Sequence, residues 1–317
     1  MNAPSLTPIF HEDGWNLRRD TVTIALLRDL LMREGAISDH VADPVFLPGL
    51  RSFGGGCHFR ARRRDGGGEV AVKLGAYANE REWITAVQVW DPGLMPVPMA
   101  MGAHLGPYRL GWLVSEWLPF GPLGPVWGGE EFRLLIDAAV RFHAIADTNA
   151  SGHRQGAVAA LPIAELTQDK VAAWLDHPQP PLPIPELRRN LPADWLWLHE
   201  HVPASVCHGD LHLANALARA APPAGPAVLI DVQPIRQPWI LEAAYLQIFQ
   251  TDPVRPGSHD LIPAMAAARA RRGLSVGDDL RQASTISLAW MAMRAWSGPG
   301  SDRGDGHWRA SLARHLG

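Results

Sequence analysis

The spacing of apolar residues changes partway along the chain. Up to residue 118, one segment with helical spacing is followed by short segments in which apolar residues alternate with polar ones or run together, as in strands. Beyond residue 119 helical spacing dominates. The pattern predicts an α+β protein in two parts, a smaller antiparallel-sheet part over residues 1–118 and a larger, mainly helical part over residues 119–317.

In the first part we expect a helix over residues 15–34. Residues 50–62 combine a glycine-rich turn with alternating residues, which predicts a hairpin, and residues 65–68 form a second turn. A third strand is expected over residues 69–74. A helix then precedes a buried strand over 110–118, which ends in the turn-forming residues 119–125.

In the second part apolar residues recur at helical intervals in several segments. Helices are expected over residues 130–146, 165–176, 195–201, 239–250, 259–272 and 278–296. One short apolar segment, residues 227–230, has the character of a strand and ends at Asp231.

Composition and charge limit the classes of protein. A formal net charge of -3 gives no reason to expect nucleic acid as a partner. The two cysteines do not make a disulfide framework, which favours a reducing cytosol. The N-terminus lacks a signal-peptide pattern, and no apolar stretch approaches the roughly 18 residues of a membrane helix. We expect a cytoplasmic protein with no membrane partner; the oligomeric state stays open.

Candidate chemistry gathers in residues 205–215, which read Ser-Val-Cys-His-Gly-Asp-Leu-His-Leu-Ala-Asn. Asp210 is followed five residues later by Asn215, and the next predicted strand ends at Asp231. Two acids and a carboxamide can hold a nucleophile and metal ions together, which is what phosphoryl transfer requires. Oxygen ligands of this kind suit Mg²⁺ (magnesium).

Three other interpretations compete for the same residues. The Gly-Asp-Leu-His segment is also found in metallophosphoesterases, but the Gly-Asn-His segment of those enzymes is absent from this sequence. Four histidines could form a zinc site: His199, His201, His208 and His212. They lie on either side of Pro203, with no cysteine pair at metal-binding spacing. A chance arrangement is the third.

The residues from His208 to Asp231 resemble the aminoglycoside phosphotransferase/choline kinase family, the small-molecule kinases of the protein-kinase-like fold. The resemblance implies that Asp210 accepts or orients the proton of the attacking hydroxyl. It implies Asn215 and Asp231 as Mg²⁺ ligands. It further implies that His208 maintains the loop by hydrogen bonding and that His212 faces the transferred phosphate.

The amino-terminal part fits the same family. A lysine on the third strand after a glycine-rich hairpin is how kinase-like folds bind nucleotide phosphates, and Lys73 has that position. The turn contains Gly54, Gly55 and Gly56. A buried lysine needs a carboxylate partner. Glu80 is the first candidate, since an aromatic residue follows it by three positions as in the family, and Glu82 is the second.

Other matches and departures follow from the resemblance. The segment Glu116, Trp117 and Leu118 corresponds to the hinge, whose backbone groups pair with the purine of ATP or GTP. His143 corresponds to a histidine that we expect to be structural. The family's Asp-Leu-Ala is replaced by a segment that starts at Glu242, which we expect to be structural or at the substrate pocket.

The expected activity is Mg²⁺-dependent transfer of the γ-phosphate of ATP or GTP to a hydroxyl of a small molecule. Basic and acidic residues are equal in number over residues 151–317, and this part is rich in tryptophan. Both features favour a neutral or aromatic acceptor over a polycation. An antibiotic (aminoglycoside, macrolide or nucleoside type) is the first candidate. The alternatives are a metabolite such as choline, a sugar or an amino alcohol, and a catalytically idle binding protein.

Overall fold

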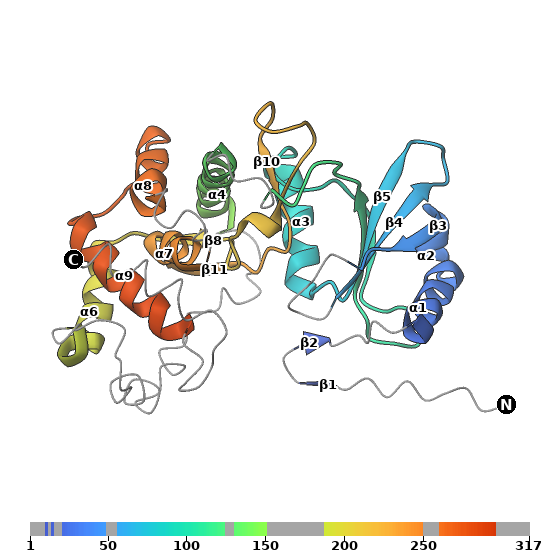
Figure 1. Cartoon of the computed structure of the whole chain (residues 1–317), viewed down its shortest axis with the longest axis horizontal. Coiled ribbons are helices and arrows are strands. Elements are labelled where there is room, and N and C mark those ends of the chain that lie inside the picture. Colours follow the sequence, from blue (N-terminus) through green and yellow to red (C-terminus); the bar gives the residue numbers. More distant parts are fainter. Residues whose placement is uncertain are drawn as a thin grey trace. The chain divides into compact units, whose positions relative to one another are not determined.

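The computed structural model of the chain describes residues 10–11, 14–15, 21–48, 56–123, 130–150, 187–249 and 260–295. Internal contacts divide the chain into two compact units, Met1–Pro119 and Phe120–Gly317. Figure 1 labels the helices and strands of both. None of the described helices has the length and apolar character needed to cross a membrane.

The first unit is built on a five-stranded antiparallel sheet (Figure 1). Its strand order is β3 (Val41–Phe46), β4 (Cys57–Arg63), β5 (Glu69–Leu74), β7 (Trp112–Glu116) and β6 (Pro98–Gly102). The described helices of this unit are α1 (Thr21–Arg33), α2 (Gly35–Ser38) and α3 (Ala78–Trp90). A separate two-stranded ladder joins β1 (Phe10–His11) and β2 (Gly14–Trp15).

Side chains of β5 alternate between the two faces of the sheet, and this alternation determines where Lys73 points. Val72 and Leu74 are fully buried in a core that also contains Leu31 of α1 and Ile37 of α2. Because neighbouring residues of a strand face opposite ways, Lys73 lies on the other face. That is the face on which α3 provides its partner.

The second unit is mainly helical. Its described helices are α4 (Glu130–Asn149), α6 (Leu187–His201), α7 (Trp239–Phe249), α8 (Leu261–Arg271) and α9 (Leu280–Ala295), with the short 3-10 helix η3 (Leu213–Asn215). Two short antiparallel ladders lie among them: β8 (Ala204–Cys207) with β11 (Ile235–Pro238), and β9 (Ala216–Ala218) with β10 (Ala227–Leu229). Helix α4 packs on β8, β10 and α8, and α7 packs on α8 and α9.

The α+β class expected from the sequence is confirmed, and most expected elements are present. The helix expected from residue 15 was wrong at its start, because residue 15 belongs to β2 and α1 begins at Thr21. Strand β6 was not predicted because it begins at Pro98, but it is an edge strand, where proline is tolerated. The expected helix over 165–176 lies outside the described residues.

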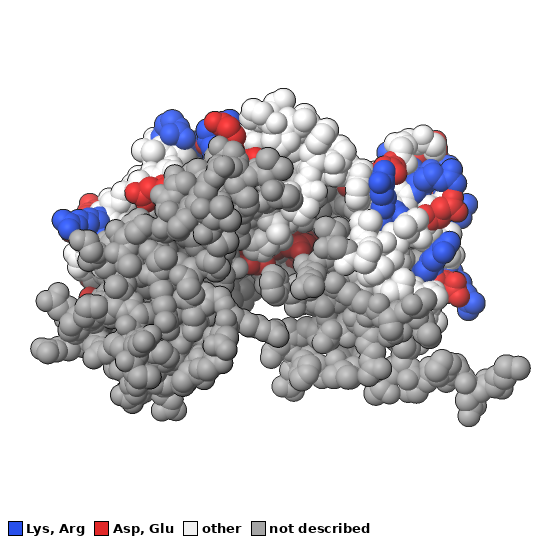
Figure 2. Space-filling model, in the orientation of Figure 1, with Lys and Arg blue, Asp and Glu red and all other residues white. Residues whose placement is uncertain are grey.

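The charged surface of the first unit is mixed in sign. On the face shown in Figure 2, blue and red atoms are interspersed over its described part. Three ion pairs contribute to this mixing: Arg60 with Glu69, Arg62 with Asp43, and Arg63 with Asp65. The expectation that the chain has no nucleic-acid partner stays a prediction.

Candidate active site

Lys73 and Glu80 form a buried ion pair in the first unit. The Nζ atom of Lys73 lies 2.8 Å from both carboxylate oxygens of Glu80, and the two residues are 8% and 5% exposed. Glu80 is in the first turn of α3 and accepts the backbone N–H of Tyr77 at 3.3 Å. The positive end of the helix dipole favours a carboxylate there. Glu82 is exposed on the same helix, so Glu80 is the acid that meets the lysine.

The other residues expected to bind nucleotide are placed less completely. Gly56 is buried directly before β4, whereas Gly54 and Gly55 lie outside the described residues. The remaining three, Glu116, Trp117 and Leu118, end β7 and begin the segment after it. The N–H of Glu116 donates to Val97 at 3.0 Å and that of Trp117 to Glu69 at 3.4 Å. These two N–H groups are engaged within the unit, and recognition of a purine by this segment stays a prediction.

In the second unit, Asp210 is surrounded by polar side chains that orient its carboxylate. Asn215 Nδ2 donates to its Oδ2 at 3.1 Å and to its backbone carbonyl at 2.9 Å. Tyr245 donates from its hydroxyl to Oδ1 at 2.7 Å. His212 Nε2 lies 3.6 Å from Oδ2. The structure therefore brings together three of the predicted residues and adds a tyrosine.

His208 and Gly209 give the loop before Asp210 its shape. The fully buried His208 donates from Nε2 to the carbonyl of Ile230 at 2.9 Å, and its Nδ1 accepts the N–H of Asp210 at 3.3 Å. Burial lowers the pKa of His208, which keeps the ring neutral and able to donate at one nitrogen and accept at the other. Gly209 has a φ of +87°, and any Cβ there would overlap the carbonyl oxygen of Gln233. Only glycine fits this turn.

Asp231 follows β10, and strand pairing carries it to the loop. Ala216 pairs with Leu229, and the N–H of Ile230 donates to the carbonyl of Asn215 at 3.0 Å. Asp231 itself has a φ of 58°, a left-handed conformation that aspartate tolerates better than most residues. Since Asn215 Nδ2 is directed at Asp210, its carboxamide oxygen is the atom left to bind a cation.

The donors near Asp210 fit a hard divalent cation. A carboxamide oxygen and the carboxylate of Asp231 are ligands that Mg²⁺ accepts, and Mg²⁺ commonly completes its shell with substrate phosphates and water. The cation would supply neutralisation of phosphate charge. The pattern expected from the sequence is consistent with this donor set, and the metal-binding roles of Asn215 and Asp231 stay predictions.

The carboxyl group of Asp210 is held ionised. Burial alone would raise its pKa, but the interaction with His212, the hydrogen bond from Tyr245 and the nearby histidines outweigh it and lower the pKa to about 2. A carboxylate that is ionised at neutral pH can accept a hydrogen bond from an approaching hydroxyl and orient it.

A buried chain of side chains supports the loop from behind. Glu242 of α7 accepts the N–H of Gly209 at 2.9 Å, and its other oxygen lies 2.7 Å from His143 Nε2. The Nδ1 atom of His143 lies 3.0 Å from Arg269 Nη1. A guanidinium can only donate, so Nδ1 accepts and the ring proton lies on Nε2, directed at Glu242. His143 and Glu242 are thus structural supports of the loop.

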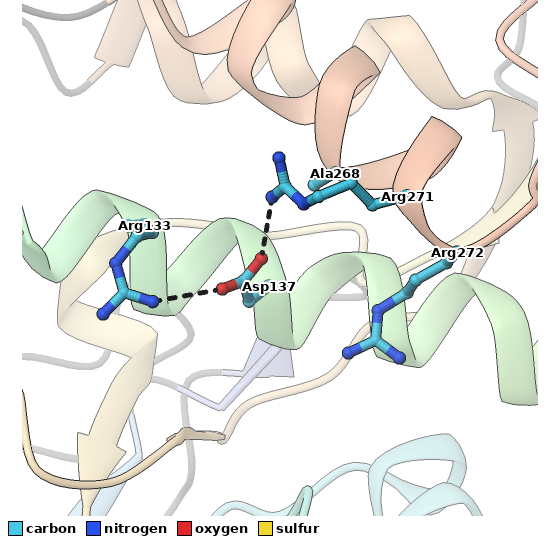
Figure 3. Close-up of a pocket in the computed structure, with 5 residues that line it drawn as sticks. All are labelled: Arg133, Asp137, Ala268, Arg271 and Arg272. Carbon is cyan, nitrogen blue, oxygen red and sulfur yellow. Dashed lines mark hydrogen bonds and ion pairs between the residues drawn. The ribbon is translucent and has the colours of Figure 1, made fainter.

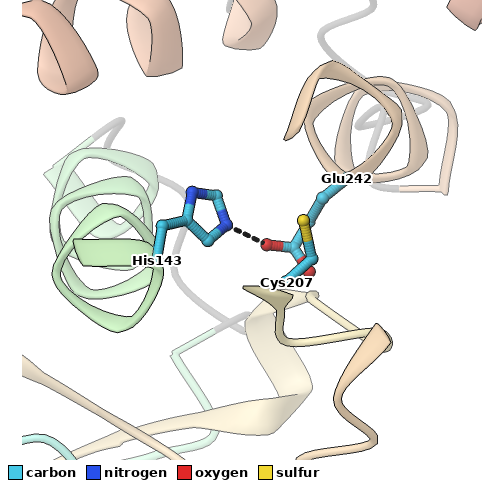
Figure 4. A group of neighbouring side chains, drawn as sticks. All are labelled: His143, Cys207 and Glu242. Atoms are coloured by element: carbon cyan, nitrogen blue, oxygen red, sulfur yellow. Dashed lines mark hydrogen bonds and ion pairs between the residues drawn. The ribbon is translucent and has the colours of Figure 1, made fainter. Parts of the chain in front are cut away.

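Cys207 lies close to this chain, and the three side chains His143, Cys207 and Glu242 could be mistaken for a metal site (Figure 4). Their potential ligand atoms lie within 4.8 Å of one another and all three residues are buried. However, the Nε2 atom of His143 carries the proton that Glu242 accepts, and burial raises the pKa of the Cys207 thiol well above its ordinary value. Metal ligation requires both groups to be deprotonated, so we interpret the cluster as a hydrogen-bonded support.

Sequence reasoning missed Tyr245 and Arg269. Tyr245 follows Glu242 by three positions on α7, so the two side chains lie on neighbouring positions of one helix face. That spacing could have indicated Tyr245 once Glu242 was placed at the loop. No local pattern indicates Arg269, because its contact with His143 joins residues 126 positions apart.

One pocket among the described residues does not contain the candidate catalytic groups. It measures about 650 Å³ and is an open groove between α4 and α8, lined by Arg133, Asp137, Ala268, Arg271 and Arg272. Figure 3 shows Arg133 and Arg271 both reaching Asp137. With exposed arginines neutralised in part by a shared acid and no nucleophile or base, this groove is not a candidate for the reaction.

Comparison with known proteins identifies the family. The model of the phosphotransferase enzyme family matches residues 49–234, more than half of the chain. The chain therefore belongs to this family, and the expected class, a small-molecule phosphotransferase with an alcohol group as acceptor, is confirmed. A nucleotide donor and a divalent metal are general features of the family. No curated protein matches the sequence.

Solved structures share the fold at low identity. An aminoglycoside phosphotransferase from Alicyclobacillus acidocaldarius is 15% identical with a TM-score of 0.57, covering 89% of this chain and 91% of that one. The amicoumacin kinase hAmiN, in complex with AMP-PNP and Ca²⁺, is 13% identical with a TM-score of 0.56, covering 93% and 92%. A choline kinase from Cryptosporidium parvum is 11% identical with a TM-score of 0.52, covering 94% of each. These likenesses confirm the kinase-like fold.

Proposed function

We propose that the protein transfers the γ-phosphate of ATP or GTP, with Mg²⁺, to a hydroxyl group of a small molecule. Lys73, positioned by Glu80, binds the nucleotide phosphates. Asn215 and Asp231 bind the metal, and Asp210 orients the acceptor hydroxyl and accepts its proton. In this proposal His212 lies on the phosphate side of Asp210.

The observation that carries the proposal is the setting of Asp210. Its carboxylate is ionised, partly exposed, and fixed by Asn215 at 3.1 Å and Tyr245 at 2.7 Å. Asn215 and Asp231 are joined to it through the pairing of β9 with β10. This arrangement supports the proposal, because phosphoryl transfer depends mainly on positioning and charge neutralisation and the three residues lie in short segments next to paired strands.

For the acceptor we propose an antibiotic of low positive charge, ahead of a metabolite such as choline, a sugar or an amino alcohol. The equal numbers of acidic and basic residues over 151–317 argue against a polycationic aminoglycoside. Trp195, Trp239 and Trp290 are buried, at 5%, 0% and 6% exposure, so these three belong to the core and do not stack on an acceptor. Trp174 and Trp296 lie outside the described residues.

The test is a screen of hydroxylated antibiotics and metabolites with Mg²⁺ and either ATP or GTP. Transfer is scored by a mass gain of about 80 Da, one phosphoryl group. In the Asp210→Ala variant, turnover of the acceptor found should fall roughly 10²–10⁴-fold. Asp65→Ala is a suitable control, because Asp65 is an exposed acid in a turn of the first unit.

Unchanged turnover in Asp210→Ala would overturn the mechanism. If the wild-type protein shows neither Mg²⁺-dependent nucleotide binding nor turnover, the alternative of a catalytically idle binding protein is correct. The proposed cytoplasmic location is supported by the low cysteine count: the chain has two, Cys57 and Cys207, which are buried and form no disulfide.

A further inference from the structure

Tyr245 makes a contact with Asp210 that the proposed reaction requires of its acceptor. The phenolic hydroxyl donates to Oδ1 of Asp210 at 2.7 Å, a short hydrogen bond to a charged group. An acceptor hydroxyl must donate to the same carboxylate before it attacks phosphorus. A side chain of the protein thus makes the hydrogen bond that the substrate is expected to make.

The two oxygens of Asp210 are not equivalent. Oδ2 accepts a hydrogen bond from Asn215 at 3.1 Å and faces His212 at 3.6 Å, so it lies on the side of the predicted metal ligand Asn215. Oδ1 faces Tyr245 and is the oxygen that does not contact Asn215. An acceptor that approaches from the opposite side to the metal ligands therefore meets the oxygen that Tyr245 holds.

Helix α7 places the tyrosine firmly. Glu242, three residues earlier on the same helix, accepts the N–H of Gly209 at 2.9 Å. One rigid element therefore holds both the backbone of the loop and the carboxylate that the loop presents. Tyr245 is only partly buried, in contrast to Glu242.

We propose that the hydroxyl of Tyr245 occupies the acceptor position at Asp210 Oδ1 until the acceptor displaces it, and that it thereby keeps water from being phosphorylated. This proposal rests on the proposed function. In the suppressed side reaction, a water oxygen would bond to the γ-phosphorus while the bond to the bridging β–γ oxygen breaks. The water proton would pass to Asp210 and the nucleoside diphosphate would leave.

The first test needs no knowledge of the acceptor. Hydrolysis of ATP and of GTP with Mg²⁺ is measured for the wild type, Tyr245→Phe and the control Tyr108→Phe, a partly buried tyrosine of the first unit. Removing the Tyr245 hydroxyl frees Oδ1 for water, so hydrolysis should rise by up to about tenfold, the equivalent of one hydrogen bond to a charged group. The control should match the wild type. Equal or slower hydrolysis in Tyr245→Phe would overturn the proposal.

A second measurement does not depend on activity. The chain has three tyrosines, so protein labelled with ¹³C at tyrosine Cζ gives few signals, and Tyr245→Phe assigns one of them. Asp210→Asn should shift that signal and leave those of Tyr77 and Tyr108 unchanged. If the Tyr245 signal does not shift in Asp210→Asn, the contact does not exist. That result would overturn this proposal but not the proposed function.

Steady-state kinetics with an acceptor from the screen separate displacement from simple structural support. If the acceptor must displace Tyr245, its KM in Tyr245→Phe should fall by up to about tenfold while kcat changes less. A tyrosine that only supports the loop would lower kcat and leave KM unchanged, and one that binds the acceptor would raise KM; either result overturns the proposal. A wild type without any Mg²⁺-dependent turnover overturns the proposed function itself.

Discussion

Replacing Glu242 with glutamine tests whether the buried charges behind the catalytic loop determine its stability. Glutamine has nearly the same shape, so the substitution removes the charge without opening a cavity. Its carboxamide oxygen can still accept the N–H of Gly209. Its NH₂ group then faces the Nε2–H of His143, donor against donor. The ring cannot reverse its tautomer, because Arg269 donates to Nδ1 at 3.0 Å.

The size of the expected loss in unfolding free energy follows from how deeply these side chains are buried. Glu242, His143 and Arg269 are at most 2% exposed, so water cannot replace a lost partner. Removing one member of a buried charged set typically costs about 3–5 kcal/mol, because the remaining charge stays buried without compensation. We therefore expect Glu242→Gln to lower the free energy of unfolding of the second unit by that amount. Glu242→Asp keeps the charge and shortens the side chain, and should cost about 1–2 kcal/mol.

The loss of stability in Glu242→Gln should also depend on pH. Burial alone would raise the pKa of Glu242, but the hydrogen bonds from His143 and from the N–H of Gly209 outweigh it and lower the pKa below its ordinary value of 4.5. A lowered pKa in the folded state means that the ionised group stabilises the fold above about pH 4.5. That stabilisation is lost as the pH falls through the folded-state pKa. The difference between wild type and Glu242→Gln should be constant from about pH 6 to 8 and shrink below 4.5.

Urea unfolding followed by tryptophan fluorescence and by far-UV circular dichroism measures these differences. Glu82→Gln is the matched control, since Glu82 is an exposed acid on α3 and should change the free energy by less than about 0.5 kcal/mol. If Glu242→Gln unfolds at the same urea concentration as Glu82→Gln, the hydrogen-bonded chain does not hold the loop. A difference that persists unchanged at acid pH would refute the assigned ionisation.

Three further substitutions test other parts of the site. Lys73→Ala should weaken nucleotide binding, and it should lower the melting temperature because Glu80 stays buried without its lysine. Adding Glu80→Gln should restore stability without restoring binding. Thermal melts and nucleotide titration measure the two effects. Gly209→Ala should abolish activity and lower the free energy of unfolding in urea by more than about 2 kcal/mol. Gly68→Ala is the control, because Gly68 is also at positive φ but has open space around it. It should cost about 1 kcal/mol and leave turnover intact. Asp231→Asn keeps a residue that tolerates positive φ. It should raise the Mg²⁺ concentration for half-maximal activity about tenfold or more.

Sequence reasoning identified the residues whose proximity in space is determined by a short spacing along one or two elements. Lys73 and Glu80 are seven positions apart, and Asp210 and Asn215 are five apart, so strand alternation and a single loop determine their meeting. Asp231 was predicted because it closely follows the next strand. The backbone constraint on Gly209 is of the same local kind, since one turn imposes it.

The residues that sequence reasoning missed are joined by tertiary packing. The contact of Tyr245 with Asp210 spans 35 positions and that of Arg269 with His143 spans 126. Neither has a motif, because any helix that packs against the loop could present a hydroxyl or a cation there. Strand β11 escaped notice for a related reason: it has only four residues, and its pairing with β8 is what makes it a strand.

Helix α7 shows why a loop motif alone does not define the site. The helix contributes no residue to the predicted catalytic or metal-binding set, yet Glu242 fixes the backbone of Gly209 and Tyr245 fixes the carboxylate of Asp210. Because both contacts come from one helix face, a small rotation of α7 would move the loop and release the carboxylate together. The different partners of the two carboxylate oxygens, Tyr245 at Oδ1 and Asn215 at Oδ2, depend on that helix. The geometry around Asp210 is therefore a property of the packing of α7 as much as of the loop sequence.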